Sequence, residues 1–331
     1  MKYPPVKNAH IVPRGYLKQF AEDGQVAAHL VREEREQIVS IDKAAVRRYF
    51  YRRQRPDGTE IDDFEYSFSE IESVVASVLG TVEENWPFPQ PVKVRLAEFF
   101  AFQAVRGPRW KQWHQRYARN AVSKKRGDRF HCLDNGIWVP ISARLLDELE
   151  ASLLSETQWL VRMSSVANKL ASIFASMRWD LVRFDDPVLA LADHPVVEWP
   201  LSDGLRMPGP ISGHGALNLL EARIPLAPDL ALLLTWQDTA DGGVPIAGNV
   251  AWAENLNAFS IGQADRQWIS RPDADVPIGH GPFTPLSVEL FPTYGPAEVE
   301  NCMGRKALGE RLNQRMGETS DQIEIVVARP S

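Results

Sequence analysis

The sequence predicts an α+β fold with a short N-terminal hairpin, a central helical bundle and a strand-rich C-terminal half that includes a closing helix. From about residue 69 to 177, apolar residues recur at helical spacing, whereas from 178 to 270 short apolar runs alternate with Asp, Pro and Gly, as strands and turns do. We therefore expect a single α+β domain over residues 1–270, followed over 271–331 by a Pro- and Gly-rich arm with a C-terminal helix and strand.

The N-terminal stretch predicts a tethered start to the chain. Pro13 suits a first helical position, and Tyr16, Leu17 and Phe20 follow it at helical spacing. We expect these residues and Val12 to be buried. The next elements expected are a hairpin of residues 26–31 and 37–41, a helix of 42–48 with Asp42 as N-cap, a strand of 49–51 and a loop of 52–63.

The helical middle is expected to begin at a capping box, Ser69-x-x-Glu72. The apolar face of the helix that follows extends to Val82. Pro91 opens a second helix that Gly107-Pro108 breaks, and the further helices expected are 109–122 and 143–177, the latter interrupted near Ser155. In the second half we expect strands at 181–184, 188–192, 222–226 and 230–236, a loop at 202–215, a helix at 249–269, a linker at 270–296, a helix at 298–316 and a strand at 322–328.

Composition places the chain among globular proteins. Hydrophobic residues make up 44% of the 331 residues and charged residues 24%. No apolar run predicts a membrane-spanning helix, and the first residues lack the form of a signal peptide. The two cysteines, Cys132 and Cys302, have no metal-like spacing. We therefore expect a cytoplasmic protein without a membrane partner. Residues 1–129 hold 23 Lys+Arg against 17 Asp+Glu, a net charge of +6; since the whole chain carries −6, the remainder carries −12. This split is typical of a protein with an anionic partner and equally of a harmless surface.

Several enzyme classes lack their recognisable motifs in this sequence. It contains no His-Glu-x-x-His pair, no Walker loop, no dinucleotide fingerprint and no Gly-x-Ser-x-Gly elbow. The well-known zinc proteases, ATPases, dehydrogenases and lipase-like hydrolases are therefore not indicated.

Two short polar groupings are candidates for chemistry. Asp193-His194 follows an expected strand, where Asp193 could orient an imidazole or hold a divalent ion and His194 could move a proton. The alternative is a turn in which Asp193 bonds nearby backbone N–H groups. If the first helix starts early, His10 and Arg14 would share one of its faces and form a donor pair for phosphate or carboxylate. The alternative is that His10 is a capping or core residue.

Two basic stretches with interleaved aromatic residues suit a nucleic-acid backbone. Residues 106–129 hold nine Lys+Arg and one acidic residue, with Trp110, Trp113 and Tyr117 among them, and residues 47–55 place arginines around Tyr49-Phe50-Tyr51. The alternative is a solvated helix face whose rings point into the core.

Five elements of the chain occur together in one known family. They are His-x-Val-Pro-x-x-Tyr-Leu-x-x-Phe at 10–20, Phe-Phe-Ala-Phe-Gln-Ala-Val-Arg-Gly-Pro at 99–108, Asp-His-Pro-Val at 193–196, Ile-Pro-Leu-Ala-Pro at 224–228, and Leu-Asn with Ala-Asp-Arg between 256 and 266. In this order they resemble a bacterial family catalogued as domain of unknown function 4238, over roughly residues 8–270. The chain departs from the family's usual serine at Ala192 and usual threonine at Gly107. The resemblance implies a fold family and no reaction.

The polar members of these elements come from distant parts of the chain, as the parts of one pocket would. They suggest His10, Asp193 and His194 as catalytic residues and Arg14, Gln103, Arg106, Asn257 and Arg266 as substrate-binding residues. Three hypotheses follow: a hydrolase of a phosphate-containing substrate, such as a nuclease or nucleotide hydrolase; a non-catalytic binding module for nucleic acid or protein that uses residues 47–55 and 106–129; and a buried hydrogen-bond network that fixes packing. A phosphorylated small molecule is a further possible partner, and the oligomeric state is left open.

Overall fold

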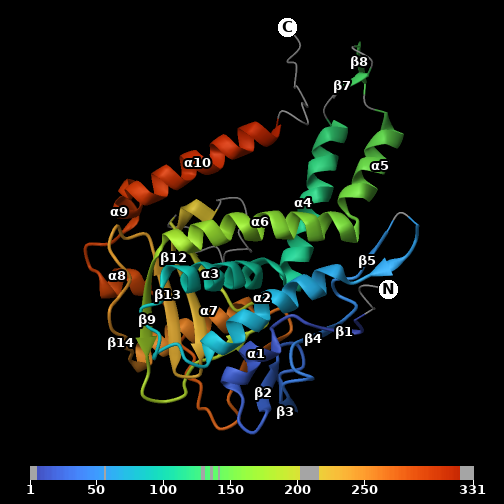
Figure 1. Cartoon of the computed structure of the whole chain (residues 1–331). Coiled ribbons are helices and arrows are strands. Elements are labelled where there is room, and N and C mark those ends of the chain that lie inside the picture. The colour runs from blue at the N-terminus through green and yellow to red at the C-terminus, as the bar shows by residue number, and fades with distance from the viewer. Residues whose placement is uncertain are drawn as a thin grey trace.

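The computed structural model describes residues 6–55, 57–127, 131–134, 137–140, 142–201 and 216–320, and these form a mixed α+β fold (Figure 1). Its centre is a five-stranded sheet in the order β11-β12-β13-β9-β14. The strands are β9 (Arg178–Arg183), β11 (Val197–Pro200), β12 (Leu219–Ala227), β13 (Leu230–Thr235) and β14 (Ile246–Ala247). All neighbours are antiparallel except β14 and β9.

Helices cover both faces of the central sheet. Alternate residues of each strand point to opposite faces, so each strand contributes to both layers of packing. Leu181, Leu232 and Leu234 belong to the large core that α3 (Gln90–Val105) and α6 (Glu156–Ser176) share. Val182 and Leu233 join a second cluster with residues of α7 (Val250–Gln263). Continuous apolar runs therefore predicted β9, β12 and β13, as expected for strands buried on both faces, whereas β11 and β14 were not predicted.

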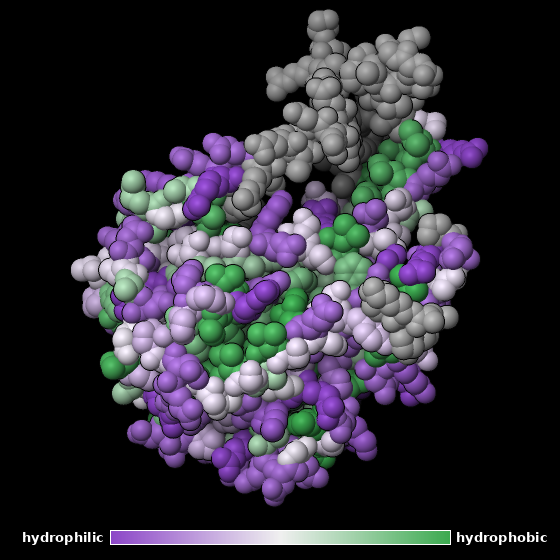
Figure 2. Space-filling view, viewed as in Figure 1, coloured by the Kyte–Doolittle hydropathy of each residue, from purple (hydrophilic) through white to green (hydrophobic). Residues whose placement is uncertain are grey.

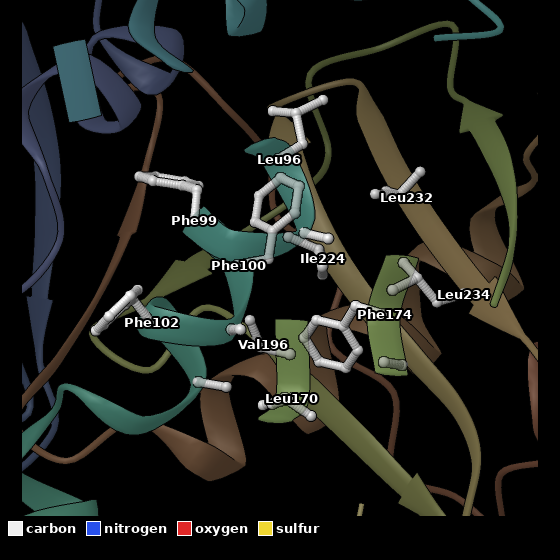
Figure 3. Packing of buried hydrophobic residues seen from close by; sticks show 14 of the residues in the cluster. Leu96, Phe99, Phe100, Phe102, Leu170, Phe174, Val196, Ile224, Leu232 and Leu234 are labelled. Atoms are coloured by element: carbon white, nitrogen blue, oxygen red, sulfur yellow. The ribbon is translucent and has the colours of Figure 1, made fainter. Parts of the chain in front are cut away.

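Helix α3 is the most deeply buried helix among the described residues, and Figure 3 shows its Phe100 beside Ile224 of the sheet, whereas Phe99 points away from the sheet and from α6. Pro91 lies in its first turn, as predicted. The break predicted near Ser155 is also confirmed, since its side chain accepts a hydrogen bond from the Gln158 amide and starts α6 after α5 (Ala143–Leu153).

The N-terminal part is tied to the core as the sequence predicted. Val12 before α1 (Arg14–Leu17), Tyr16 and Leu17 within it and Phe20 after it are all buried, and the Tyr16 hydroxyl donates to the Pro225 carbonyl in β12. The predicted hairpin is confirmed as β2 (Gln25–Leu30) and β3 (Arg35–Ser40). With β10 (Leu191–Ala192) and β15 (Gln267–Ser270) these strands form an antiparallel sheet in the order β10-β15-β2-β3.

Four local predictions are wrong, and in the first of them a partner distant in the chain decides the structure. Residues 42–48 are not a helix, since β4 (Val46–Arg48) pairs with β1 (Asn8–His10). Residues 49–51 form a turn. The first long helix, α2 (Asp63–Leu79), begins before Ser69, whose hydroxyl donates to the Glu65 carbonyl instead of capping. The loop predicted at 52–63 contains the strand pair β5 (Arg53–Gln54) and β6 (Glu60–Ile61).

The closing helix is shorter than the sequence predicted. It ends at Gln263, and residues 267–269 belong to β15 because they pair with β2 and β10. The predicted linker holds α8 (Leu286–Leu290), and the helix expected at 298–316 is observed as α9 (Pro296–Asn301) and α10 (Met303–Ser320). The loop at 202–215 and the strand at 322–328 lie outside the described residues.

One pair of helices projects from the body of the molecule (Figure 1). These are α4 (Pro108–Gly127) and α5, with the hairpin of β7 (His131–Asp134) and β8 (Ile137–Pro140) at their far end. Figure 2 shows an apolar patch in the centre of the same view, over α2 and α3, whose exposed apolar residues include Val74 and Val94. Within the described part of the chain, no helix has the length and apolar character needed to cross a membrane.

Candidate functional site: the α3–α4 junction and the α4–α6 face

The end of α3 brings several of the predicted site residues together. Arg106 is the C-cap of α3 and donates from Nη2 to the His10 carbonyl oxygen at 2.6 Å. Gly107 follows, at a position where a Cβ atom would lie 3.7 Å from the Asp193 carbonyl oxygen and 3.9 Å from His194 Nδ1. We call this group, His10, Arg106, Gly107, Asp193 and His194, the α3–α4 junction.

The Arg106 guanidinium is buried and held on all sides by the protein. Its Nε donates to the Tyr51 hydroxyl at 3.0 Å, and its Nη1 forms an ion pair with Glu72 at 2.5 Å. The guanidinium also lies over the Phe68 ring, 4.6 Å from its centroid. These contacts use the donors that a substrate phosphate would need, so Arg106 joins β1, α2 and α3 to one another.

The Asp193 carboxylate caps the turn between α7 and β15. Oδ1 accepts from the Asp265 amide at 2.7 Å, and Oδ2 accepts from the amides of Arg266 at 2.9 Å and Gln267 at 3.3 Å. Burial raises the pKa of Asp193, while these three N–H groups act in the opposite direction. Asp193 thus binds backbone N–H groups, as in the turn-type alternative, but these groups belong to a segment distant in the chain and not to a turn at Asp193 itself.

His194 and Gln103 hold hydrogen-bonding atoms that the surrounding residues do not satisfy. Nδ1 of His194 and both amide atoms of Gln103 are buried and have no hydrogen-bond partner in the described parts of the chain. Gln103 lies in the last turn of α3, and Gly107 follows the end of that helix. Burial, aided by the positive charge of Arg109, lowers the pKa of His194 to about 3, and the imidazole is therefore neutral at physiological pH.

His10 and Arg14 do not share a helix face. His10 ends β1, and its Nε2 lies 3.3 Å from the Ile41 carbonyl oxygen, whereas α1 begins only at Arg14. The Arg14 guanidinium is exposed and forms an ion pair with Asp42 at 2.6 Å. The His10 pKa is lowered, chiefly by burial.

Asn257 and Arg266 are placed by the fold in different ways. The Asn257 side chain is buried; it accepts from the Ala190 amide at 2.9 Å and donates to the carbonyls of Val188 and Pro277 at 2.8 Å each. It therefore fixes α7 to the segment before β10. The Arg266 side chain is exposed, while its amide binds Asp193 and its carbonyl accepts from Val31.

The described residues contain no group of three or more His, Cys, Asp or Glu side chains that could hold a metal ion. The Asp193 oxygens instead accept three backbone hydrogen bonds. The unsatisfied polar atom of the junction is His194 Nδ1, and Gln103 in α3 holds two more such atoms among the described residues.

A second candidate surface lies where α4 crosses α6. Trp110 and Trp113 stack with ring centroids 4.7 Å apart, and Trp113 and Tyr117 stack at 5.5 Å, with interplanar angles of 23° and 22°. Arg162 of α6 places its guanidinium 4.1 Å from the centroid of the Tyr117 ring. Tyr117 is 46% exposed. We call this set, together with the exposed Arg116 and Arg119 of α4, the α4–α6 face.

The other basic stretch, residues 47–55, is largely neutralised by acidic partners. Arg47 pairs with Asp265 at 2.7 Å, Arg53 with Asp63 at 2.6 Å, and Arg52 with both Glu60 and Asp62. Tyr51 is buried. The charge of this stretch therefore ties β4 and β5 to neighbouring elements, and the side chains of Lys124, Lys125 and Arg126 lie outside the described set.

Sequence reasoning did not include Arg162 in either basic stretch. Its contact with Tyr117 joins two helices whose residues are 45 positions apart, and no local pattern indicates such a pair. A row of basic residues along one face of α6 would have indicated that Arg162 belongs to a basic surface, and the sequence around Arg162 shows no such row.

Comparison with protein families places residues 8–274 in the family described as Protein of unknown function (DUF4238), and the chain belongs to that family. The match confirms the resemblance carried by the five sequence elements. None of the curated proteins and none of the solved structures matches the chain.

Proposed function

We propose that this protein is a cytoplasmic binding module for single-stranded nucleic acid and that the α4–α6 face contacts the strand. The observation that carries the proposal is the ladder of stacked rings from the buried Trp110 to the exposed Tyr117, with the Arg162 guanidinium against its outer end. Bases of any sequence can stack on such rings, and arginines beside them bind phosphates.

The ladder differs from an ordinary apolar helix face in its order along α4. The rings lie at helix positions i, i+3 and i+7, so each supports the next and Tyr117 is held in a fixed orientation. A ring held in this way loses little side-chain entropy when a base stacks on it. Arg116 and Arg119 flank Tyr117 and are exposed, where they can follow a phosphate backbone.

Direct binding of labelled oligonucleotides tests the proposal. We expect fluorescence anisotropy to show single-stranded RNA or DNA of about 20 nucleotides binding the full chain more tightly than a duplex of the same length. Tyr117→Ala should weaken binding about 10-fold or more, because stacking of one base contributes about 1–3 kcal/mol. Arg116→Gln and Arg119→Gln should each reduce the slope of log K against log salt by about 1.

Tyr49 supplies a matched control. It is 45% exposed and has the Arg52 guanidinium 3.9 Å from its ring centroid, but Arg52 is bound to Glu60 and Asp62. Tyr49→Ala should leave the affinity unchanged. An equal loss in the two tyrosine variants, or no binding by the unmodified chain at low salt, would overturn the proposal.

A hydrolase of phosphate-containing substrates is the second candidate, and it is favoured by the unsatisfied buried atoms of His194 and Gln103. Native structures rarely leave such atoms without a partner, so a bound ligand group is one way to satisfy them. Turnover of bis(p-nitrophenyl) phosphate and of the same oligonucleotides, with magnesium or manganese and with chelator, tests this candidate. Hydrolysis that is lost in His194→Ala supports it, and the absence of hydrolysis in every condition removes it.

A further inference from the structure

Three polar residues from three adjacent strands form a line on the sheet β10-β15-β2-β3. Ser270 of β15 has its Oγ 3.1 Å from His29 Nε2, and the other ring nitrogen, Nδ1, lies 3.6 Å from Glu36 Oε2 in β3. Both distances involve one imidazole of β2, which thus lies between a hydroxyl and a carboxylate. None of these residues belongs to the α3–α4 junction or the α4–α6 face.

The strand register explains why the three groups meet. His29 lies directly opposite Glu36 on one side and Trp268 on the other, and Ser270 is two residues beyond Trp268. Residues opposite each other, and their diagonal neighbours on the same face, are within side-chain reach across antiparallel strands. The imidazole also stacks on the Trp268 indole, with centroids 3.4 Å apart and planes 4° apart, and this fixes the orientation of the ring.

The geometry points to Ser270 as a nucleophile for acyl transfer from a small carboxylic ester, with His29 as its general base and Glu36 as the residue that positions the imidazole. A hydroxyl bound to one nitrogen of a histidine whose other nitrogen faces a carboxylate is the arrangement that activates serine on unrelated folds. It is recognised by geometry and not by sequence order, so the absence of Gly-x-Ser-x-Gly does not bear on it.

The reaction balances with the groups present and water. Ser270 Oγ attacks the ester carbonyl while its proton moves to His29 Nε2; the alcohol leaves with that proton, and an acyl-serine remains. Water then attacks the acyl carbon, with His29 again taking a proton and returning it to Ser270. The His29 pKa is lowered, chiefly by burial, so the imidazole is the neutral base at physiological pH.

Exposure restricts the size of the substrate. The His29 side chain is 21% exposed and Glu36 54% exposed, whereas Ser270 is 1% exposed. We therefore expect small acyl groups to react and bulky ones to be excluded.

Methanesulfonyl fluoride, a small electrophile, tests whether Ser270 is nucleophilic. Its reaction forms an Oγ–S bond and breaks the S–F bond, and fluoride leaves while His29 accepts the hydroxyl proton. Intact mass spectrometry and peptide mapping of the full chain should find one adduct, at Ser270. We expect no adduct in Ser270→Ala and labelling at least 100-fold slower in His29→Gln.

Ser260 supplies a matched control, since it is equally buried and its Oγ has no hydrogen-bond partner within the described ranges. Ser260→Ala should label at the unmodified rate. If a variant fails to fold, as circular dichroism would show, the position of the adduct in the unmodified chain still decides the question. The inference would be overturned by the absence of an adduct, by an adduct at another residue, or by equal labelling in His29→Gln. The contact between Ser270 and His29 would then be a cross-strand hydrogen bond without a catalytic role.

Glu36→Gln separates a positioning role from a purely structural one. The Glu36 carboxylate raises the His29 pKa, against the larger opposite effect of burial. Its removal should slow labelling and move the pH midpoint of the labelling rate to lower values. An unchanged pH profile would contradict a role of Glu36 in positioning His29.

Discussion

The α3–α4 junction and the α4–α6 face use similar residue types for opposite purposes. At the junction, Arg106 and Asp193 are buried, and their polar atoms contact neighbouring elements. At the face, Tyr117 remains almost half exposed beside arginines of two helices. The contrast shows that a polar residue within a family element can serve the architecture, while a surface outside those elements leaves an aromatic ring and arginines exposed.

The largest effect that this comparison predicts is for Arg106→Leu. The substitution leaves the Glu72 carboxylate and the Tyr51 hydroxyl without their donor and should lower the free energy of unfolding by about 3–5 kcal/mol. Urea denaturation followed by tryptophan fluorescence measures it.

Arg14 is the control for Arg106. Its ion pair with Asp42 is exposed on both sides, so Arg14→Ala should change stability by less than about 1 kcal/mol. Similar losses in the two variants would show that Arg106 is not the structural centre of the junction.

The next effect in size is for Asp193→Ala. Three backbone N–H groups lose their acceptor in this variant. Each buried donor without an acceptor lowers the free energy of unfolding by about 1–3 kcal/mol, and water that reaches the turn recovers part of this loss. We expect a loss of about 3 kcal/mol and an unchanged affinity for oligonucleotides. Weaker oligonucleotide binding by a fully folded Asp193→Ala variant would contradict the separation of the junction from the face.

Much of the fold could be predicted from the sequence because its main elements carry local signs. The break near Ser155, Pro91 in a first turn and the apolar runs of β12 and β13 are read from neighbouring residues alone. The errors fall where pairing over long distances decides: residues 46–48 are a strand because of β1, and residues 267–269 are a strand because of β2.

The candidate sites divide in the same way. The sequence placed His10, Arg106, Asp193 and His194 in one set, and the fold brings them to one junction. It could not show that backbone N–H groups of residues 265–267 occupy the Asp193 oxygens, or that Arg162 reaches Tyr117 from another helix. Such contacts depend on the packing of elements and not on the pattern within any one of them.

A pH-dependent effect is expected from His194. Its pKa is about 3 in the folded protein against an ordinary value of 6.5, so below pH 6.5 only the unfolded state gains the proton. The stability that the neutral imidazole contributes is complete above pH 6.5 and is lost as the pH falls towards 3.

The matched variant is His194→Gln. Between pH 6.5 and 4.5 the unmodified protein should lose about 1 kcal/mol per pH unit relative to this variant, as measured by urea denaturation at each pH. The comparison cancels the contributions of His10 and His114, whose pKa values are also lowered by burial. A difference that does not vary with pH would mean that His194 is protonated within the fold or exposed to water.

The smallest effect concerns Gly107, which lies against both Asp193 and His194. Atoms around a Cβ at this position would be 3.7–4.0 Å away, which is ordinary van der Waals contact. Gly107→Ala should therefore raise the free energy of unfolding by about 0.5 kcal/mol, since it reduces the freedom of the unfolded chain. Gly107→Ser adds a hydroxyl near His194 Nδ1, which lacks a partner in the described part of the molecule, and should add about 1 kcal/mol more. Equal stability of the alanine and serine variants in urea denaturation would show that His194 gains nothing from a donor at this position.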